Sequence, residues 1–92
     1  MRVVWTSPAR KHRDALVRYI ALDNPEAAIM VDRAISAAIS RLILFPSSGR
    51  IGRVADTREV VIHPNYILVY MLRDDSIVIL HVLHASQQYP PQ

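Results

Sequence analysis

The order of apolar and polar residues divides the chain into a short apolar start, two amphipathic segments and an apolar second half. Residues 1–6 favour a strand, because they contain two valines and a tryptophan. Two capping signals follow, Ser7-Pro8 and Asn24-Pro25, in which a polar side chain accepts from free N–H groups and proline suits the first helical turn. They predict one helix that ends near Leu22 and a second that ends before Phe45-Pro46, since a residue that precedes proline is disfavoured in a helix. Only one or two residues separate the helices, so we expect an antiparallel hairpin.

The second half of the chain predicts three strands. Residues 58–63 are rich in β-branched side chains, and residues 66–72 and 77–84 flank a polar turn at residues 73–76 that predicts a β-hairpin. A loop over residues 46–53 precedes these strands and holds both glycines. The predicted fold class is α+β: an N-terminal strand, an antiparallel helical hairpin and three antiparallel strands, with the helices on one face of the sheet.

Both faces of this predicted sheet are apolar. In the strand at residues 66–72, the alternation places Val69 on one face and Tyr66 on the other. In the strand at residues 77–84, it places Val82 on one face and Leu83 on the other. An antiparallel sheet with one wet face alternates apolar with polar residues, and two helices cover only one face. We therefore infer that another polypeptide covers the second face; the alternative is a tightly curled sheet that packs on itself.

Composition limits the classes of protein that fit this pattern. The 92 residues are 51% hydrophobic and 21% charged, which excludes disorder for most of the chain and predicts one domain over residues 1–92, with residues 85–92 as a C-terminal tail. No cysteine is present, which excludes disulfides, thiolate catalysis and cysteine-ligated zinc. The apolar runs are too short for a membrane span, and the start does not read as a signal peptide, so we expect a cytoplasmic protein.

The positive charge is carried almost entirely by arginine. The net charge is +3, with eleven basic residues of which ten are arginines. The guanidinium fork suits carboxylates and phosphates, so an acidic protein segment or a nucleic acid is the expected partner; a compositional bias is the alternative. Arg50 and Arg53 flank Gly52 in the predicted loop and could grip such a group, or they could be solvated. Glu59 follows Arg58 directly in the sequence, and the expected role of these charges is a cross-strand ion pair.

Several segments, taken in order, resemble the RelE/ParE superfamily of toxins from type II toxin–antitoxin modules. The resemblance covers nearly the whole chain and is strongest for the ParE branch, whose members include plasmid stabilisation proteins. The segments are Trp5-Thr6-Ser7-Pro8-Ala9, Tyr19-Ile20-Ala21, Asn24-Pro25-Glu26-Ala27-Ala28, Phe45-Pro46, Gly49-Arg50, Thr57-Arg58-Glu59-Val60-Val61, Tyr66-Ile67-Leu68-Val69-Tyr70, Ile79-Leu80-His81-Val82-Leu83-His84 and the Gln-Gln-Tyr-Pro tail.

The resemblance implies a cognate antitoxin as partner. Such antitoxins have a DNA-binding N-terminal part and a flexible C-terminal part that wraps the toxin, so operator DNA is contacted only through the antitoxin and a heterotetramer is one expected assembly. The antitoxin would supply the missing cover on the sheet, and an acidic tail would meet the arginines. The expected residues for binding the antitoxin or the target are Arg50, Arg53, Arg58, Tyr66, Val69 and Val82.

The resemblance also implies an activity, and its two branches differ. A ParE-like toxin stalls growth by binding a target, DNA gyrase above all, without a cofactor and without turnover. A RelE-like toxin cleaves messenger RNA on the ribosome, for which it needs basic residues at positions that here read Ile67 and Gln87. The third possibility is a degenerate, non-toxic chain that only binds its antitoxin and acts as a corepressor.

The nuclease alternative has its own candidate residues. They are His84, Arg58, Tyr89 and His63, with His84 as acid or base because histidine titrates near neutral pH. The tail around Tyr89 is either a binding segment or a frayed end. Four histidines without cysteine or a helical histidine pair give no metal-ligand spacing, so we expect no metal site.

Overall fold

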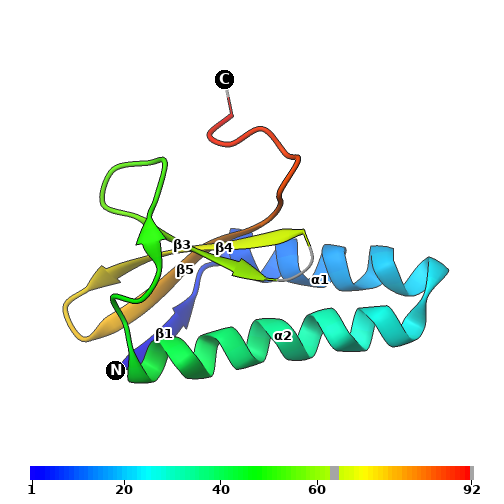
Figure 1. The fold of residues 1–92 in the computed structure, drawn as a ribbon, viewed down its shortest axis with the longest axis horizontal. Coiled ribbons are helices and arrows are strands. Elements are labelled where there is room, and N and C mark those ends of the chain that lie inside the picture. The colour runs from blue at the N-terminus through cyan, green and yellow to red at the C-terminus, as the bar shows by residue number, and fades with distance from the viewer. Residues whose placement is uncertain (63–64, 92) are drawn as a thin grey trace.

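In the computed structural model, residues 1–62 and 65–91 are described, and within them a five-stranded mixed sheet packs against a hairpin of two long helices (Figure 1). The strand order across the sheet is β1-β5-β4-β3-β2. The elements are β1 Arg2–Trp5, α1 Ser7–Asp23, α2 Pro25–Leu44, β2 Arg50–Ile51, β3 Arg58–Ile62, β4 Tyr66–Arg73 and β5 Ser76–His84. The predicted α+β class and the order of the main elements are therefore confirmed.

The helix ends follow the capping chemistry of the sequence with one correction. Asn24 serves both helices: its backbone N–H donates to the Ile20 carbonyl that ends α1, and its side chain accepts from the Ala27 N–H at 3.1 Å to begin α2. For α1 the cap is Thr6 rather than Ser7, which is already helical. The Thr6 hydroxyl accepts from the Ala9 N–H and donates to the Ile79 carbonyl at 2.7 Å, so it also ties the helix to β5. The bond to Ile79 joins residues far apart in the sequence, so the local pattern of residues did not indicate Thr6 as the cap.

Two features of the sheet differ from the prediction. The strand β1 runs parallel to β5, whereas the other neighbouring pairs of strands are antiparallel, so the sheet is mixed. The predicted loop also contains the two-residue strand β2, whose Arg50 pairs with Glu59 of β3. A strand this short carries no alternation of its own, and only its position beside β3 defines it.

The two faces of the sheet hold separate apolar clusters. The larger cluster lies between the sheet and the helices and includes the fully buried residues Ile35, Leu42, Leu68, Tyr70, Ile77 and Ile79. The smaller cluster lies on the opposite face, called here the second face, and is formed by Ile67, Val69 and Leu83 with Leu80 and Tyr89 packed against it. The prediction that both faces are apolar is thus confirmed.

A bulge in β5 reverses part of the predicted alternation. Val69 pairs with His81 and Tyr70 with Ile79, so Leu80 is an extra residue opposite β4. Beyond this residue each side chain points to the face opposite the one predicted. Val82 lies in the helix-side core, and Leu83 joins the second face. The placement of Val82 on a partner-facing surface was therefore wrong.

The loop after α2 is fastened to the sheet by polar groups from two strands. The Tyr70 hydroxyl donates to the Pro46 carbonyl at 2.7 Å and accepts from the Gly49 N–H at 3.0 Å. Arg58 donates to the carbonyls of Ser47 and Gly49 at 3.0 and 2.8 Å. A Cβ on Gly49 would lie 2.6 Å from the Tyr70 hydroxyl oxygen, so glycine is required for this close approach.

We predict that Tyr70→Phe lowers the free energy of unfolding by about 1–3 kcal/mol, because it leaves the buried Gly49 N–H without an acceptor. Urea unfolding of the purified chain measures the change. Tyr66→Phe is the matched control on the same strand, since its hydroxyl makes no hydrogen bond to any other described residue, and it should change stability by less than about 0.5 kcal/mol. Equal effects of the two substitutions would contradict this role for Tyr70.

Candidate functional site

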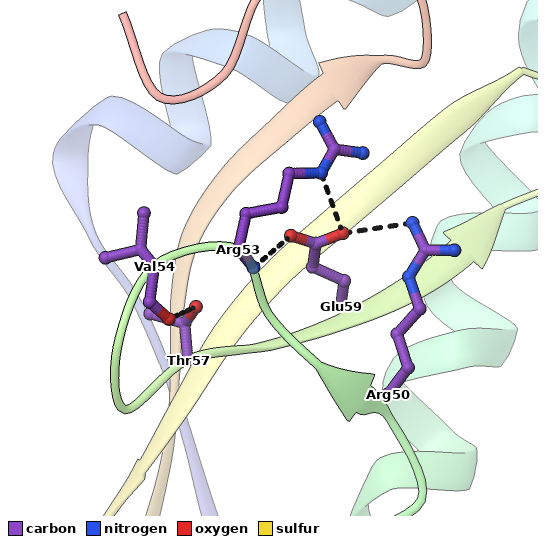
Figure 2. Close-up of polar contacts among 5 residues, drawn as sticks. All are labelled: Arg50, Arg53, Val54, Thr57 and Glu59. Carbon is purple, nitrogen blue, oxygen red and sulfur yellow. Dashed lines mark hydrogen bonds and ion pairs between the residues drawn. The ribbon is translucent and has the colours of Figure 1, made fainter.

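A buried carboxylate on the second face gathers two arginines around it. Glu59 lies opposite Val69 in the β3–β4 ladder, and its side chain is only 1% exposed. One carboxylate oxygen accepts from the Arg50 guanidinium at 3.0 Å and lies 3.6 Å from the Arg53 Nε, and the other accepts from the Arg53 backbone N–H at 3.0 Å (Figure 2). Glu59 is therefore paired with the two loop arginines and not with Arg58.

The loop that carries Arg53 is held in shape by its own hydrogen bonds. The Gly52 N–H donates to the Thr57 carbonyl at 2.8 Å. The Thr57 hydroxyl donates to the Val54 carbonyl at 2.7 Å, as Figure 2 shows. A Cβ on Gly52 would collide with Thr57, so this residue must be glycine. The sequence Arg50-Ile51-Gly52-Arg53 thus allows a tight turn in which both arginines reach one carboxylate.

The electrostatics of this cluster favour an ionised Glu59 and leave positive charge exposed. Burial raises the pKa of Glu59, but the Arg53 backbone N–H, the Arg50 guanidinium and the two positive charges together hold it below its usual value. The Arg50 and Arg53 side chains remain 53% and 40% exposed. Two guanidinium groups share one carboxylate, so the cluster presents one net positive charge at the surface.

The C-terminal strap, defined as residues 85–91, lies on the second-face side of the sheet. Figure 1 shows it rising from the end of β5 on the side of the sheet away from the helices, as does the loop after β2. Tyr89 packs against the second-face cluster, so this part of the tail is not a frayed end. Burial raises the pKa of the Tyr89 phenol, the charge of Glu59 raises it further and the charge of Arg53 opposes them. Tyr89 therefore lies close to the Glu59 cluster.

Two histidines extend the site towards α1. The rings of His12 and His81 stack with their centroids 5.4 Å apart and their planes at 23°, and His81 contacts Tyr89 edge-on at 5.4 Å. Burial lowers the pKa of His81, and the neighbouring His12 lowers it further. Within the part of the chain that the structure describes, the buried His12 Nδ1 has no hydrogen-bond partner. The three rings connect the first helix to the strap across the edge of β5.

The nuclease candidates do not converge in the structure. Arg58 pairs with Tyr70 and His84 with Tyr66, so the two lie four residues apart along β4, a separation of roughly 13 Å. The His84 Nδ1 bonds to the N–H and hydroxyl of Ser86, and the His84 ring meets Tyr66 edge-on at 5.4 Å. Tyr89 lies on the second face, and His63 falls outside the described residues.

The residues predicted to bind a partner divide between the two faces. Arg50, Arg53 and Val69 come together on the second face. The other three face the helix side: Arg58 fastens the loop, Tyr66 packs against the core and Val82 is buried in it. Sequence reasoning missed the central role of Glu59 and the anchoring role of Tyr89. The available signal for Glu59 was a single carboxylate in a run of β-branched residues.

A second surface of interest runs along the free edge of β3. The short strand β2 pairs only with Arg58 and Glu59, so the rest of β3 has no neighbour on that side within the described residues. The groove beside it has a volume of about 350 Å³ and is lined by Ala38, Arg41, Leu42, Ser48, Gly49, Arg50, Glu59, Val60 and Val61. It is open and mainly apolar, and two arginines, Arg41 and Arg50, are among its lining residues.

Among residues 1–62 and 65–91, no three histidine or acidic side chains lie close enough together to hold a metal ion. Neither of the two helices seen there is long and apolar enough to cross a membrane. The site that the structure offers is a protein surface with apolar and guanidinium groups.

The comparisons with known proteins agree with this fold. The family model described as "ParE toxin of type II toxin-antitoxin system, parDE" matches residues 3–89, so the chain belongs to the ParE toxin family. Y4kP of Sinorhizobium fredii (strain NBRC 101917 / NGR234), which is named as a presumed toxin, is 41% identical over 97% of this chain and 93% of its own. Toxin RelE2 of Caulobacter vibrioides (strain ATCC 19089 / CIP 103742 / CB 15) is 31% identical over 94% and 97%.

Solved structures share the architecture at lower identity. A chain from the chromosomal ParDE toxin–antitoxin system of P. aeruginosa superposes with a TM-score of 0.81 at 20% identity, covering 94% of this chain and 97% of that one. A copper-bound mutant toxin from Helicobacter pylori gives a TM-score of 0.69 at 20% identity over 94% and 96%. The molecule is therefore a toxin of a type II toxin–antitoxin system, and its family implies an antitoxin partner.

We predict that Glu59→Gln lowers the free energy of unfolding by about 1–3 kcal/mol near neutral pH, because the two arginines lose their shared counter-charge. The folded pKa is depressed, so this stabilisation is complete above the ordinary value of 4.5 and is lost as the pH falls through the folded pKa. The gap between wild type and variant in urea unfolding should therefore shrink in acid. Asp14→Asn, which breaks the exposed pair with Arg18, is the control and should change stability by less than about 0.5 kcal/mol.

We also predict that His81 makes the fold sensitive to mild acid. Its pKa is lower in the fold than the ordinary value of 6.5, so protonation favours the unfolded chain and stability falls as the pH drops below that value. His81→Gln should flatten this part of the stability profile, measured as the midpoint of urea unfolding between about pH 7 and about pH 5. His84→Gln, at an exposed position, is the control. A profile that is equally steep in the His81 variant would refute the assignment.

Proposed function

We propose that this toxin stalls growth by binding a macromolecular target in the cytoplasm, with DNA gyrase as that target, and that its cognate antitoxin neutralises it. Membership of the ParE family supports this proposal. The observation that carries the binding mode is the second face, where an apolar cluster covered in part by Tyr89 lies beside two partly exposed guanidinium groups that share one buried carboxylate. Such a surface suits recognition of an acidic and apolar segment better than turnover of a substrate.

The candidate groups for RNA cleavage are engaged in structural roles, which supports binding over hydrolysis. One nitrogen of the Arg58 guanidinium donates to two loop carbonyls, and His84 is bonded to Ser86. The position that carries a basic residue in RelE-like nucleases is Ile67, which is buried in the second-face cluster. An alkyl side chain there cannot stabilise the charge of a cleaved phosphate.

We predict that the purified chain blocks DNA supercoiling by purified gyrase and that His84→Ala blocks it equally well. The readout is the loss of supercoiled plasmid on a gel. Adding the product of the adjacent reading frame, the expected antitoxin, should restore supercoiling. A gyrase reaction that proceeds unchanged at a large molar excess of the folded toxin would refute gyrase as the target.

A ribosome-dependent endoribonuclease is the second candidate, favoured by the relative named Toxin RelE2. Translating ribosomes incubated with the chain would then show codon-dependent cuts in messenger RNA that disappear with His84→Ala. Growth arrest when the chain is expressed without its antitoxin separates both activities from a non-toxic corepressor. The heterotetramer with antitoxin is tested by the mass of the co-purified complex.

A further inference from the structure

The second face is covered by a segment of the chain that is held at few points. Ile67, Val69 and Leu83 are at most 5% exposed, and Tyr89 of the strap packs on this cluster together with Leu80 of β5. No helix contributes to this cluster in the described structure. Tyr89 of the strap therefore supplies part of the cover that protects the apolar residues of the second face from water.

The strap is attached firmly at its start and weakly at its end. The Ala85 N–H donates to the Asn65 carbonyl at 2.6 Å, and the Gln87 N–H donates to the His84 carbonyl at 2.9 Å. From residue 88 to residue 91, no hydrogen bond to any described residue fixes the chain. The Tyr89 ring, lying on the apolar cluster and against His81, is the contact that closes this part of the strap. A segment held by one side chain opens at a low free-energy cost.

The surface beneath the strap has a definite chemistry. Opening would expose a patch of three aliphatic side chains next to the Glu59 cluster, whose arginines carry one charge more than the carboxylate neutralises. A matching segment would place one large apolar side chain where Tyr89 lies and a carboxylate against Arg53, forming a charge-assisted hydrogen bond. This charge complementarity identifies an acidic polypeptide as the occupant.

We infer that the C-terminal strap masks the docking surface for the antitoxin and that an acidic, apolar segment of the antitoxin displaces Tyr89 when it binds. The inference rests on the proposed neutralisation by an antitoxin and adds which face is used and what must move. The strap and the antitoxin segment compete for one site. The apparent dissociation constant is the intrinsic constant divided by the fraction of open molecules, so a strap closed in nine of ten molecules weakens binding about tenfold.

The test measures the affinity of the adjacent-frame product for four forms of the full chain: wild type, Tyr89→Ala, Tyr89→Phe and Tyr19→Ala. Tyr89→Ala should bind at least about threefold more tightly because the strap no longer closes. Tyr89→Phe keeps the ring and should match the wild type within about twofold. Tyr19→Ala makes the same truncation at a side chain that is 75% exposed on α1 and should also match it.

Opening of the strap is also measured in the absence of the antitoxin. The chain has no cysteine, so Gln88→Cys accepts a single fluorescent label on the strap. The anisotropy of this label should fall in the Tyr89→Ala background and stay unchanged with Tyr89→Phe. Circular dichroism checks that each variant folds, and Tyr89→Gln replaces Tyr89→Ala if the exposed apolar face makes the latter aggregate.

The outcomes separate the inference from the proposed function. Tighter binding and a more mobile label in Tyr89→Ala support the masked site. Affinity that is unchanged or weaker in a folded Tyr89→Ala chain, while wild type still binds, overturns the inference and leaves neutralisation by the antitoxin intact. In the same assay, Arg53→Gln should weaken binding to Tyr89→Ala; unchanged affinity would overturn the predicted carboxylate contact. If neither wild type nor Tyr89→Ala binds the adjacent-frame product, both proposals fail.

Discussion

A hairpin of two helices can cover only one side of a five-stranded sheet, and this constraint governs the rest of the described structure. The helix side resembles an ordinary small-domain core, with a continuous set of aliphatic residues and Tyr70 fully buried. The other side must be protected by whatever remains of the chain. It is protected by a bulged strand, a short loop and the terminal strap, which together bury only a small apolar cluster.

Glu59 connects this thinly covered side to the loop that follows the helices. Burying a carboxylate is costly unless it is fully paired, and here β2 brings the Arg50 guanidinium to it and the loop between β2 and β3 brings the backbone N–H and guanidinium of Arg53. The same contacts fix where Arg50 and Arg53 emerge on the surface. One buried residue thus both shapes the loop and sets the sign of the surface potential beside the apolar cluster.

Local signals in the sequence were enough for most of the fold. Asn24-Pro25 located the helix junction, Phe45-Pro46 located the end of α2, and the polar turn before β5 located the hairpin. Each of these depends on backbone chemistry within a few residues. The same holds for the conclusion that both sheet faces are apolar, which needed only the alternation of side chains.

The errors arose wherever a distant contact decides the outcome. The bulge at Leu80 moved Val82 into the core, because an extra residue in one strand cannot be detected from that strand's own alternation. The pairing of Glu59 with Arg50 and Arg53 and the packing of Tyr89 on the second-face cluster also join residues that lie apart in the chain. Of the six residues predicted to bind a partner, Arg50, Arg53 and Val69 lie together on the second face, but the sequence did not indicate Glu59 as the centre of that cluster.

The parallel pairing of β1 with β5 also determines the order in which the chain can be completed. Arg2 lies beside Ser76, and the Thr6 hydroxyl bonds to a carbonyl 73 residues further along. The first strand of the sheet thus has no neighbour until almost the last residue has left the ribosome, and loop closure over such a length is slow. A nascent chain therefore cannot complete the sheet, or the surface that it presents, until β5 has been made.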